Sequence, residues 1–105
     1  MSPMLDPQML KKLQKMQEDL KKAQAEINAS IFYGQAGGSV VKVSVKGTKE
    51  IVSVDIKKAE LDMNDVEMLQ DLIKAALNDA FRRVDKEIEE TMGSLTQGIR
   101  SPGRF

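Results

Sequence analysis

The sequence predicts an α+β fold in which a long helix, a three-stranded antiparallel sheet and a second long helix follow one another. Apolar residues recur every three or four positions over residues 6–29 and 64–92, which is the period of an α-helix. Between these segments, apolar and polar residues alternate on both sides of a Gly-Thr turn, which is the pattern of a β-hairpin. The chain has 105 residues, a length that suits a single domain.

The first helix is expected over residues 6–29. Asp6 can cap its free N–H groups, and Pro7 costs no hydrogen bond at the first helical position. Its apolar residues alternate between spacings of four and three: Met9, Leu13, Met16, Leu20, Ala23 and Ile27. This is the narrow seam of a coiled coil rather than the broad face of a helix on a globular core.

The sheet is expected to begin with residues 31–33 (Ile-Phe-Tyr), a short strand that leads into a turn in the glycine-rich run 34–38. Valine alternates with Lys and Ser over residues 41–46. After Gly47 and Thr48, a second alternating run covers residues 52–57. We therefore expect a hairpin whose valine face is buried and whose lysine face is exposed to solvent.

The second helix is expected from about residue 64 to residue 92, with Gly93 ending it. Asn64 and Glu67 have the spacing of a capping box, and Asp65 suits the positive end of the helix dipole. The first half carries a broad apolar face, and the second half thins to residues four apart: Val84, Ile88 and Met92. We expect the broad half to pack on the sheet and the thin half to leave it. Residues 1–92 then form one domain, and residues 93–105 form a flexible tail.

The composition excludes most enzyme chemistry. The absence of Cys removes disulfides, thiolate nucleophiles and cysteine-ligated metals, and the absence of His removes the commonest general base. Without a His beside them, the carboxylates of the second helix are expected to face solvent rather than to bind a metal or act as an acid–base couple. We therefore expect neither an enzyme, nor a cofactor, nor a small-molecule substrate.

No apolar run approaches the roughly 20 residues that cross a bilayer. The first residues lack a basic region followed by an apolar one, so no signal peptide is expected. A cytoplasmic protein without a membrane partner is the expectation.

The expected helix lengths point to a dimer. The helices are roughly 36 Å and 43 Å long at 1.5 Å per residue, whereas a compact chain of this size has a radius of gyration of about 13 Å. A three-stranded sheet cannot cover both helices, so their narrow seams need a partner. We expect a symmetric homodimer with projecting helical arms. The alternative is a monomer whose two helices pack antiparallel along their whole length.

The charges are segregated, although the chain as a whole is neutral. Residues 31–58 carry five Lys against two acids, whereas residues 59–92 carry ten acids against four bases. A polyanion would therefore meet the first half of the chain and the tail, away from much of the second half.

Three stretches resemble the YbaB/EbfC family: residues 10–18 (LKKLQKMQE), 37–43 (GGSVVKV) and 67–80 (EMLQDLIKAALNDA). The third stretch is the most specific, and the resemblance covers nearly the whole chain, including residues 101–103 (Ser-Pro-Gly). The resemblance implies a bacterial nucleoid-associated protein, a tweezer-like homodimer that binds double-stranded DNA without a cofactor. It brings no catalytic residue with it.

The resemblance directs attention to the basic residues of both helices as DNA contacts: Lys11, Lys12, Lys15, Lys21, Lys22, Arg82, Arg83 and Lys86. On a helix, Lys11, Lys15 and Lys22 fall on one stripe, and their flexible ammonium groups suit phosphate contacts that do not read sequence. The tail residues Arg100 and Arg104 are further candidates.

The spacing alone also permits a plainer interpretation. The lysines of the first helix fit a solvated helix face, with Lys22 paired to Glu18 or Glu26. On the second helix, the spacing fits the ion pairs Asp79–Arg83, Asp85–Arg82 and Lys86–Glu90.

A second function remains open from the sequence. Long seams that overhang a small sheet also fit a protein-interaction or chaperone-like clamp. The sequence does not identify protein partners, such as replication or repair proteins, or a preferred DNA sequence.

Overall fold

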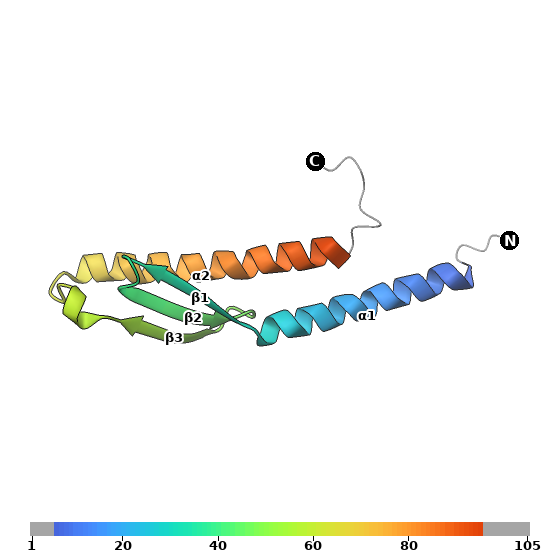
Figure 1. Ribbon diagram of the computed structural model, residues 1–105, viewed down its shortest axis with the longest axis horizontal. Coiled ribbons are helices and arrows are strands. Elements are labelled where there is room, and N and C mark those ends of the chain that lie inside the picture. Colours follow the sequence, from blue (N-terminus) through green and yellow to red (C-terminus); the bar gives the residue numbers. More distant parts are fainter. Residues whose placement is uncertain (1–5, 96–105) are drawn as a thin grey trace, which may run out of the picture.

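The structure is a computed structural model that describes residues 6–95. It confirms the predicted α+β order: α1 (Pro7–Ala29), β1 (Ile31–Ala36), β2 (Val41–Lys46), β3 (Ile51–Ile56), the 3₁₀ turn η1 (Lys58–Glu60) and α2 (Val66–Leu95). The strands form one antiparallel sheet in the order β1-β2-β3, so β1 and β3 are its two edges. Figure 1 shows α2 lying along the sheet while α1 extends away from it.

The helix ends agree with the prediction at α1 and differ at α2. Asp6 caps α1 as expected, because its side-chain oxygen accepts the N–H of Met9 at 2.7 Å. At α2 the cap is Asp65 rather than Asn64, and its Oδ1 accepts the N–H of Met68 at 3.0 Å. The helix also continues through Gly93 to Leu95. One glycine weakens a helix by only about 1 kcal/mol and does not by itself end it.

The first strand is longer than predicted. β1 continues through Gly34 to Ala36, and the turn is made instead by Gly37 and Gly38, whose φ angles are +64° and +65°. Gly34 is buried under α2, where the helix backbone comes too close for a side chain. The glycine therefore serves the packing of helix on sheet rather than the turn.

The core lies between β2 and the middle of α2. Val41, Val43 and Val45 are buried against α2 residues that are themselves buried: Ala76, Ala80 and Val84. Since Ile88 also packs against this cluster, the apolar contact of α2 extends further along the helix than predicted.

The predicted burial of the β3 valines is wrong for the single chain. Val52 and Val54 are 50% and 41% exposed. The reason is that α2 packs on β1 and β2, and β3 lies beyond the part of the sheet that the helix covers.

The molecule is elongated, as the predicted helix lengths require. Its extents are 74 × 28 × 19 Å and its radius of gyration is 20.4 Å, against about 13 Å for a compact chain of this length. The helices lie side by side only where the second half of α1 meets the last turns of α2. Accordingly Ile27 is buried, whereas Met9 and Leu13 are 50% and 39% exposed. None of the helices within residues 6–95 is long and apolar enough to cross a membrane.

Candidate nucleic-acid interface

The lysines of α1 form the first group of candidate residues. All five are exposed: Lys11, Lys12, Lys15, Lys21 and Lys22. Lys15 lies 3.6 Å from Asp19, one helical turn away. Within residues 6–95 the other four lysines have no carboxylate within 4.0 Å, so the pairing of Lys22 with Glu18 or Glu26 is not formed. Most of this positive charge is therefore free to meet an outside partner.

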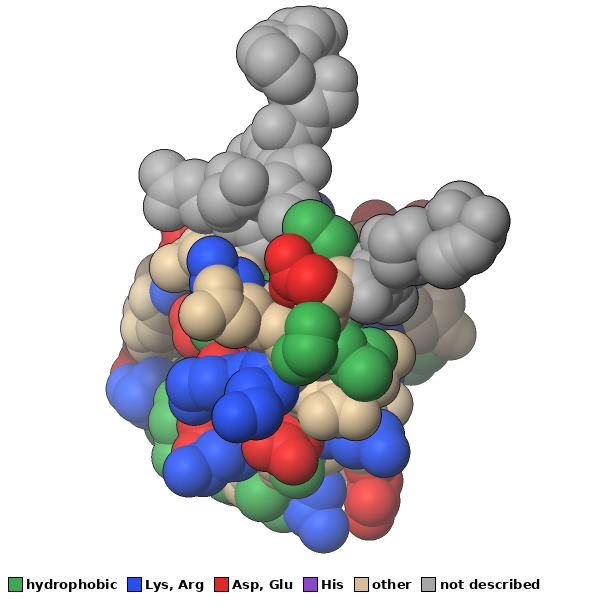
Figure 2. All heavy atoms as spheres, turned by 90° about the vertical axis from the view of Figure 1, so that its right-hand side faces the viewer, with side chains coloured by type: hydrophobic (Ala, Val, Ile, Leu, Met, Phe, Trp, Pro, Cys, Tyr) green, Lys and Arg blue, Asp and Glu red, His purple; other side chains and the backbone are tan. Residues whose placement is uncertain are grey.

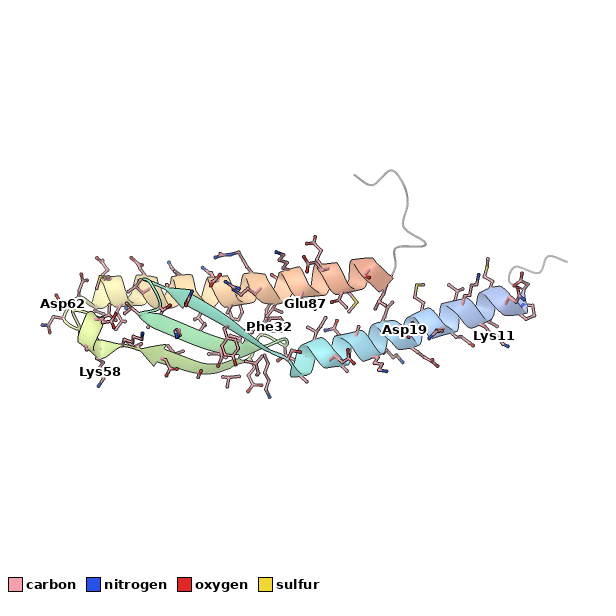
Figure 3. All side chains as sticks on the ribbon, viewed as in Figure 1. Lys11, Asp19, Phe32, Lys58, Asp62 and Glu87 are labelled. Carbon is pink, nitrogen blue, oxygen red and sulfur yellow. The ribbon has the colours of Figure 1, made fainter. Side chains whose placement is uncertain are left out.

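The first half of α1 carries three of these lysines beyond the end of α2. Figure 3 shows Lys11 near the tip of this projecting segment and Asp19 close to where α1 reaches α2. Because α1 extends alone there, no other element of residues 6–95 covers these lysines. This side of the helix is open to a polyanion.

The groove between α1 and α2 is mainly acidic, in contrast to the lysine-bearing segment of α1. Its charged lining is three acids and one base, and the residues are Asp19, Lys22, Ala23, Glu26, Glu90, Thr91, Ser94 and Leu95. Phosphates are repelled from such a groove, so a duplex would lie against the outer side of α1.

The end-on view shows how charged side chains are distributed at this end of the molecule. Figure 2 looks at the molecule from the free end of α1, where Lys and Arg side chains alternate with Asp and Glu and apolar side chains reach the surface between them. Among the coloured side chains in this view, acidic and apolar ones separate several of the basic ones. Phosphate contacts would have to come from individual side chains placed along the arm.

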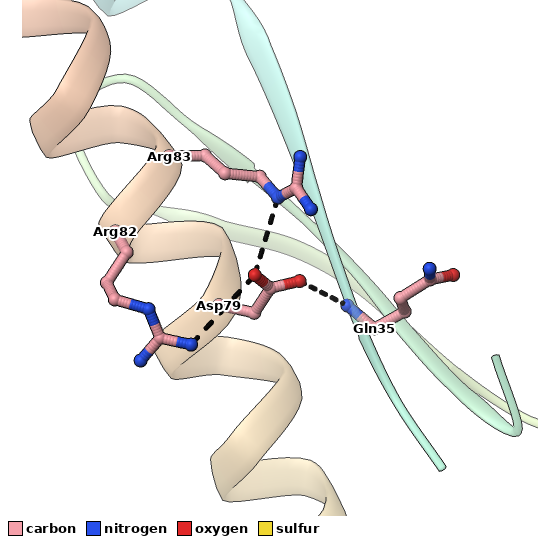
Figure 4. A network of polar contacts seen from close by, with 4 residues as sticks. All are labelled: Gln35, Asp79, Arg82 and Arg83. Carbon is pink, nitrogen blue, oxygen red and sulfur yellow. Dashed lines mark hydrogen bonds and ion pairs between the residues drawn. The ribbon is translucent and has the colours of Figure 1, made fainter. Parts of the chain in front are cut away.

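The second group of candidates centres on Asp79 of α2 (Figure 4). Its Oδ1 lies 3.5 Å from Nε of Arg83 and 3.9 Å from a terminal nitrogen of Arg82. Its Oδ2 accepts the backbone N–H of Gln35 in β1 at 3.1 Å. The carboxylate thus holds both arginines beside the free edge of β1.

The remaining predicted pairs of α2 are arranged differently. Asp85 contacts Lys49 of the β2–β3 turn at 2.8 Å instead of Arg82, which the sequence spacing does not reveal. Lys86 is exposed and has no carboxylate within 4.0 Å among residues 6–95.

The two basic groups stay apart in the single chain. The arginines lie beside β1, whereas Lys11, Lys12 and Lys15 lie on the projecting half of α1. Arg100 and Arg104 lie outside the described residues.

Sequence reasoning missed a polar hollow of about 280 Å³ at the β1 edge. It is lined by Tyr33, Gly34, Gln35, Lys42, Asp79 and Arg83. The side chains come from β1, β2 and α2, and Gln35 and Asp79 are 44 positions apart in the chain. Only the alternation of Lys42 with the buried valines indicated that this lysine faces outward. Residues 6–95 contain no cluster of His, Cys, Asp or Glu arranged to hold a metal ion.

Comparison with known proteins places this arrangement in a family. The model of the YbaB/EbfC DNA-binding family matches residues 4–99. A nucleoid-associated protein of Alkaliphilus metalliredigens is 44% identical over 97 residues, which cover 92% of this chain and 85% of that protein. One of Pelotomaculum thermopropionicum is 45% identical, covering 92% of each chain.

A solved structure has the same fold. The crystal structure of an uncharacterized protein from Helicobacter pylori matches with a TM-score of 0.70 and 24% identity, covering 87% of this chain and 97% of that one. At this sequence identity the similarity shows the fold alone. The family match and the relatives show the family to which the chain belongs. These comparisons confirm the resemblance found in the sequence, and the chain belongs to the YbaB/EbfC DNA-binding family.

Proposed function

We propose that this protein is a nucleoid-associated homodimer that grips double-stranded DNA through lysine and arginine contacts to phosphate. The single observation that carries the proposal is the projecting half of α1, on which exposed lysines lie beyond the end of α2. Membership of a DNA-binding family and relatives named nucleoid-associated proteins support DNA as the partner.

Phosphate rather than base contact follows from the chemistry of the arm. Lysine presents a point charge on a flexible stem, which suits a backbone and carries no base code. The described part of α1 has no aromatic residue for stacking on bases. A sequence preference would then come mainly from the shape and stiffness of the DNA.

The homodimer is supported by apolar surface that one chain leaves open. Met9, Leu10 and Leu13 are exposed on α1, and a second exposed group lies on β3: Ile51, Val52 and Val54. A second copy that covers such residues removes them from water, which contributes about 25 cal/mol per Å² of apolar surface. Two projecting arms related by a two-fold axis would form tweezers around a duplex.

A location in the nucleoid and an effect on DNA organisation and gene expression follow from this activity. The surface of α1 also leaves a specific alternative. Since its exposed Met and Leu side chains lie among the lysines, the arm has the composition to hold a protein client.

A charge-matched experiment separates the two functions. One variant carries Lys11→Gln, Lys12→Gln and Lys15→Gln, and the control carries Lys57→Gln, Lys58→Gln and Lys74→Gln, three exposed lysines away from α1. If each lost phosphate contact costs roughly eightfold at 0.1 M salt, the arm variant should bind a labelled duplex at least a hundredfold more weakly. The control should bind within about threefold of the unmodified chain.

Circular dichroism and solution mass should be the same for all three proteins, because the six lysines lie on the surface. Equal losses of affinity in the arm variant and the control would mean that net charge alone matters. An arm variant that binds DNA normally would overturn the proposal and favour the clamp.

A further inference from the structure

We propose that the hollow at the β1 edge is a second phosphate-contact site, in which Arg83 and Lys42 bind a phosphodiester of duplex DNA beside Tyr33. The inference rests on the DNA-binding function proposed above and adds a contact away from the α1 arm. The occupant is defined by its chemistry, a singly charged phosphodiester within a longer backbone.

The terminal N–H groups of Arg83 are available to bind a phosphate. Asp79 lies 3.5 Å from the Nε of Arg83, and in Figure 4 no dashed line joins either terminal nitrogen to that carboxylate. The planar pair of terminal N–H groups is the part of a guanidinium that binds phosphate with two parallel hydrogen bonds. The side chain is 59% exposed, so a duplex can reach it.

Lys42 supplies the second charge from the sheet. It lies opposite Gln35 in the β1–β2 register and lines the same hollow as Arg83. Its cross-strand neighbour on β3 is Asp55, yet no carboxylate of residues 6–95 lies within 4.0 Å of its ammonium group. Two nearby lysines differ, since Lys46 of β2 pairs with Glu50 and Lys49 of the β2–β3 turn pairs with Asp85.

Asp79 also lines the hollow, and its negative charge opposes a phosphate. The negative charge of Asp79 is largely compensated, because its carboxylate accepts the Gln35 N–H and lies near both Arg82 and Arg83. The hollow is thus lined by two cations, Arg83 and Lys42, against one carboxylate, which leaves it with a net positive charge.

The exposure of the site favours a phosphate that belongs to DNA over a free one. Two exposed cations hold a free phosphate weakly, because water screens them. A duplex already held by α1 presents its phosphates at high local concentration, so an additional weak contact still adds affinity. The exposed hydroxyl of Tyr33 offers a further hydrogen-bond donor at the rim.

The chain provides its own probe of this site. It has one Tyr and no Trp, so its intrinsic fluorescence comes from Tyr33 alone. A duplex that enters the hollow should change the Tyr33 emission in step with the binding curve of a labelled duplex.

The test compares Lys42→Gln and Arg83→Gln with the control Lys58→Gln, an exposed and unpaired lysine on η1 that points away from the molecule in Figure 3. At 0.1 M salt each hollow variant should bind duplex DNA about five- to tenfold more weakly, and the slope of log K against log salt should fall by about 1. Lys42→Arg should restore most of the affinity, and Lys58→Gln should change neither quantity.

The outcomes distinguish this inference from the function on which it rests. If the unmodified chain binds no DNA, the proposed function fails. If it binds DNA while both hollow variants keep its affinity, its salt slope and its Tyr33 response, the second site is overturned. Inorganic phosphate at the same phosphate concentration should leave the Tyr33 emission unchanged, and a full response to it would instead assign the hollow to a small phosphate ligand.

Discussion

Gly34 of β1 lies directly beneath Ala76 of α2, so that a Cβ atom at position 34 would come within 2.2 Å of the Ala76 carbonyl oxygen. It would also lie 2.6 Å from the backbone nitrogen of Ala80. These are backbone atoms of a helix and cannot rotate away. The contact fixes how closely α2 approaches β1, and it therefore sets where Asp79 and Arg83 stand relative to the strand edge.

Gly34→Ala should lower the free energy of unfolding by about 2 kcal/mol or more, because the added methyl group forces helix and sheet apart. Gly93→Ala is the matched control, since its Cβ would meet nothing within 4 Å and the residue lies in α2. Removing that helical glycine should raise the stability by about 0.5–1 kcal/mol. Urea unfolding followed by circular dichroism measures both, and effects of the same sign would contradict this packing.

Asp79→Asn should increase the affinity for duplex DNA by about two- to eightfold at 0.1 M salt. The amide oxygen can still accept the Gln35 N–H, while one repelling charge is lost and both arginines are released. Asp71→Asn removes an equal charge from an exposed site elsewhere on α2 and should act more weakly. Equal affinities for the Asp79 variant and the unmodified chain would show that the arginines take no part in binding.

If the chain forms a homodimer through α1, polar substitutions at the exposed apolar residues of α1 should weaken the dimer. The double change Met9→Gln and Leu13→Gln should leave the stability of the single chain within about 0.5 kcal/mol, because both side chains are already exposed. It should weaken the dimer at least tenfold in sedimentation equilibrium, where the unmodified chain should weigh about twice 11.7 kDa. Met63→Gln, a change at a similarly exposed residue before α2, should keep the dimer mass. A monomeric unmodified chain at micromolar concentration would refute the homodimer.

Much of the fold could be predicted because it depends on local sequence patterns. Asp6 and Pro7 mark the start of α1, and the alternation over residues 41–46 marks β2. The length of the two helices, read from periodicity alone, already required an elongated molecule. Each of these features depends on neighbours within a few residues along the chain.

The features that could not be predicted depend on contacts between distant segments. Gly34 has the composition of a turn residue, and its place inside β1 becomes clear only when α2 is laid over it. Val52 and Val54 alternate like core residues, yet α2 covers the other two strands and leaves them exposed. Lys42 became a candidate only because the fold places it in the lining of the same hollow as Arg83.

The most direct test of phosphate contact is the affinity of the full chain for one duplex, measured by anisotropy between 50 and 200 mM salt. If about four phosphates are neutralised, the affinity should fall on the order of a hundredfold across this range. An affinity that changes by less than about twofold would contradict phosphate contact as the basis of binding.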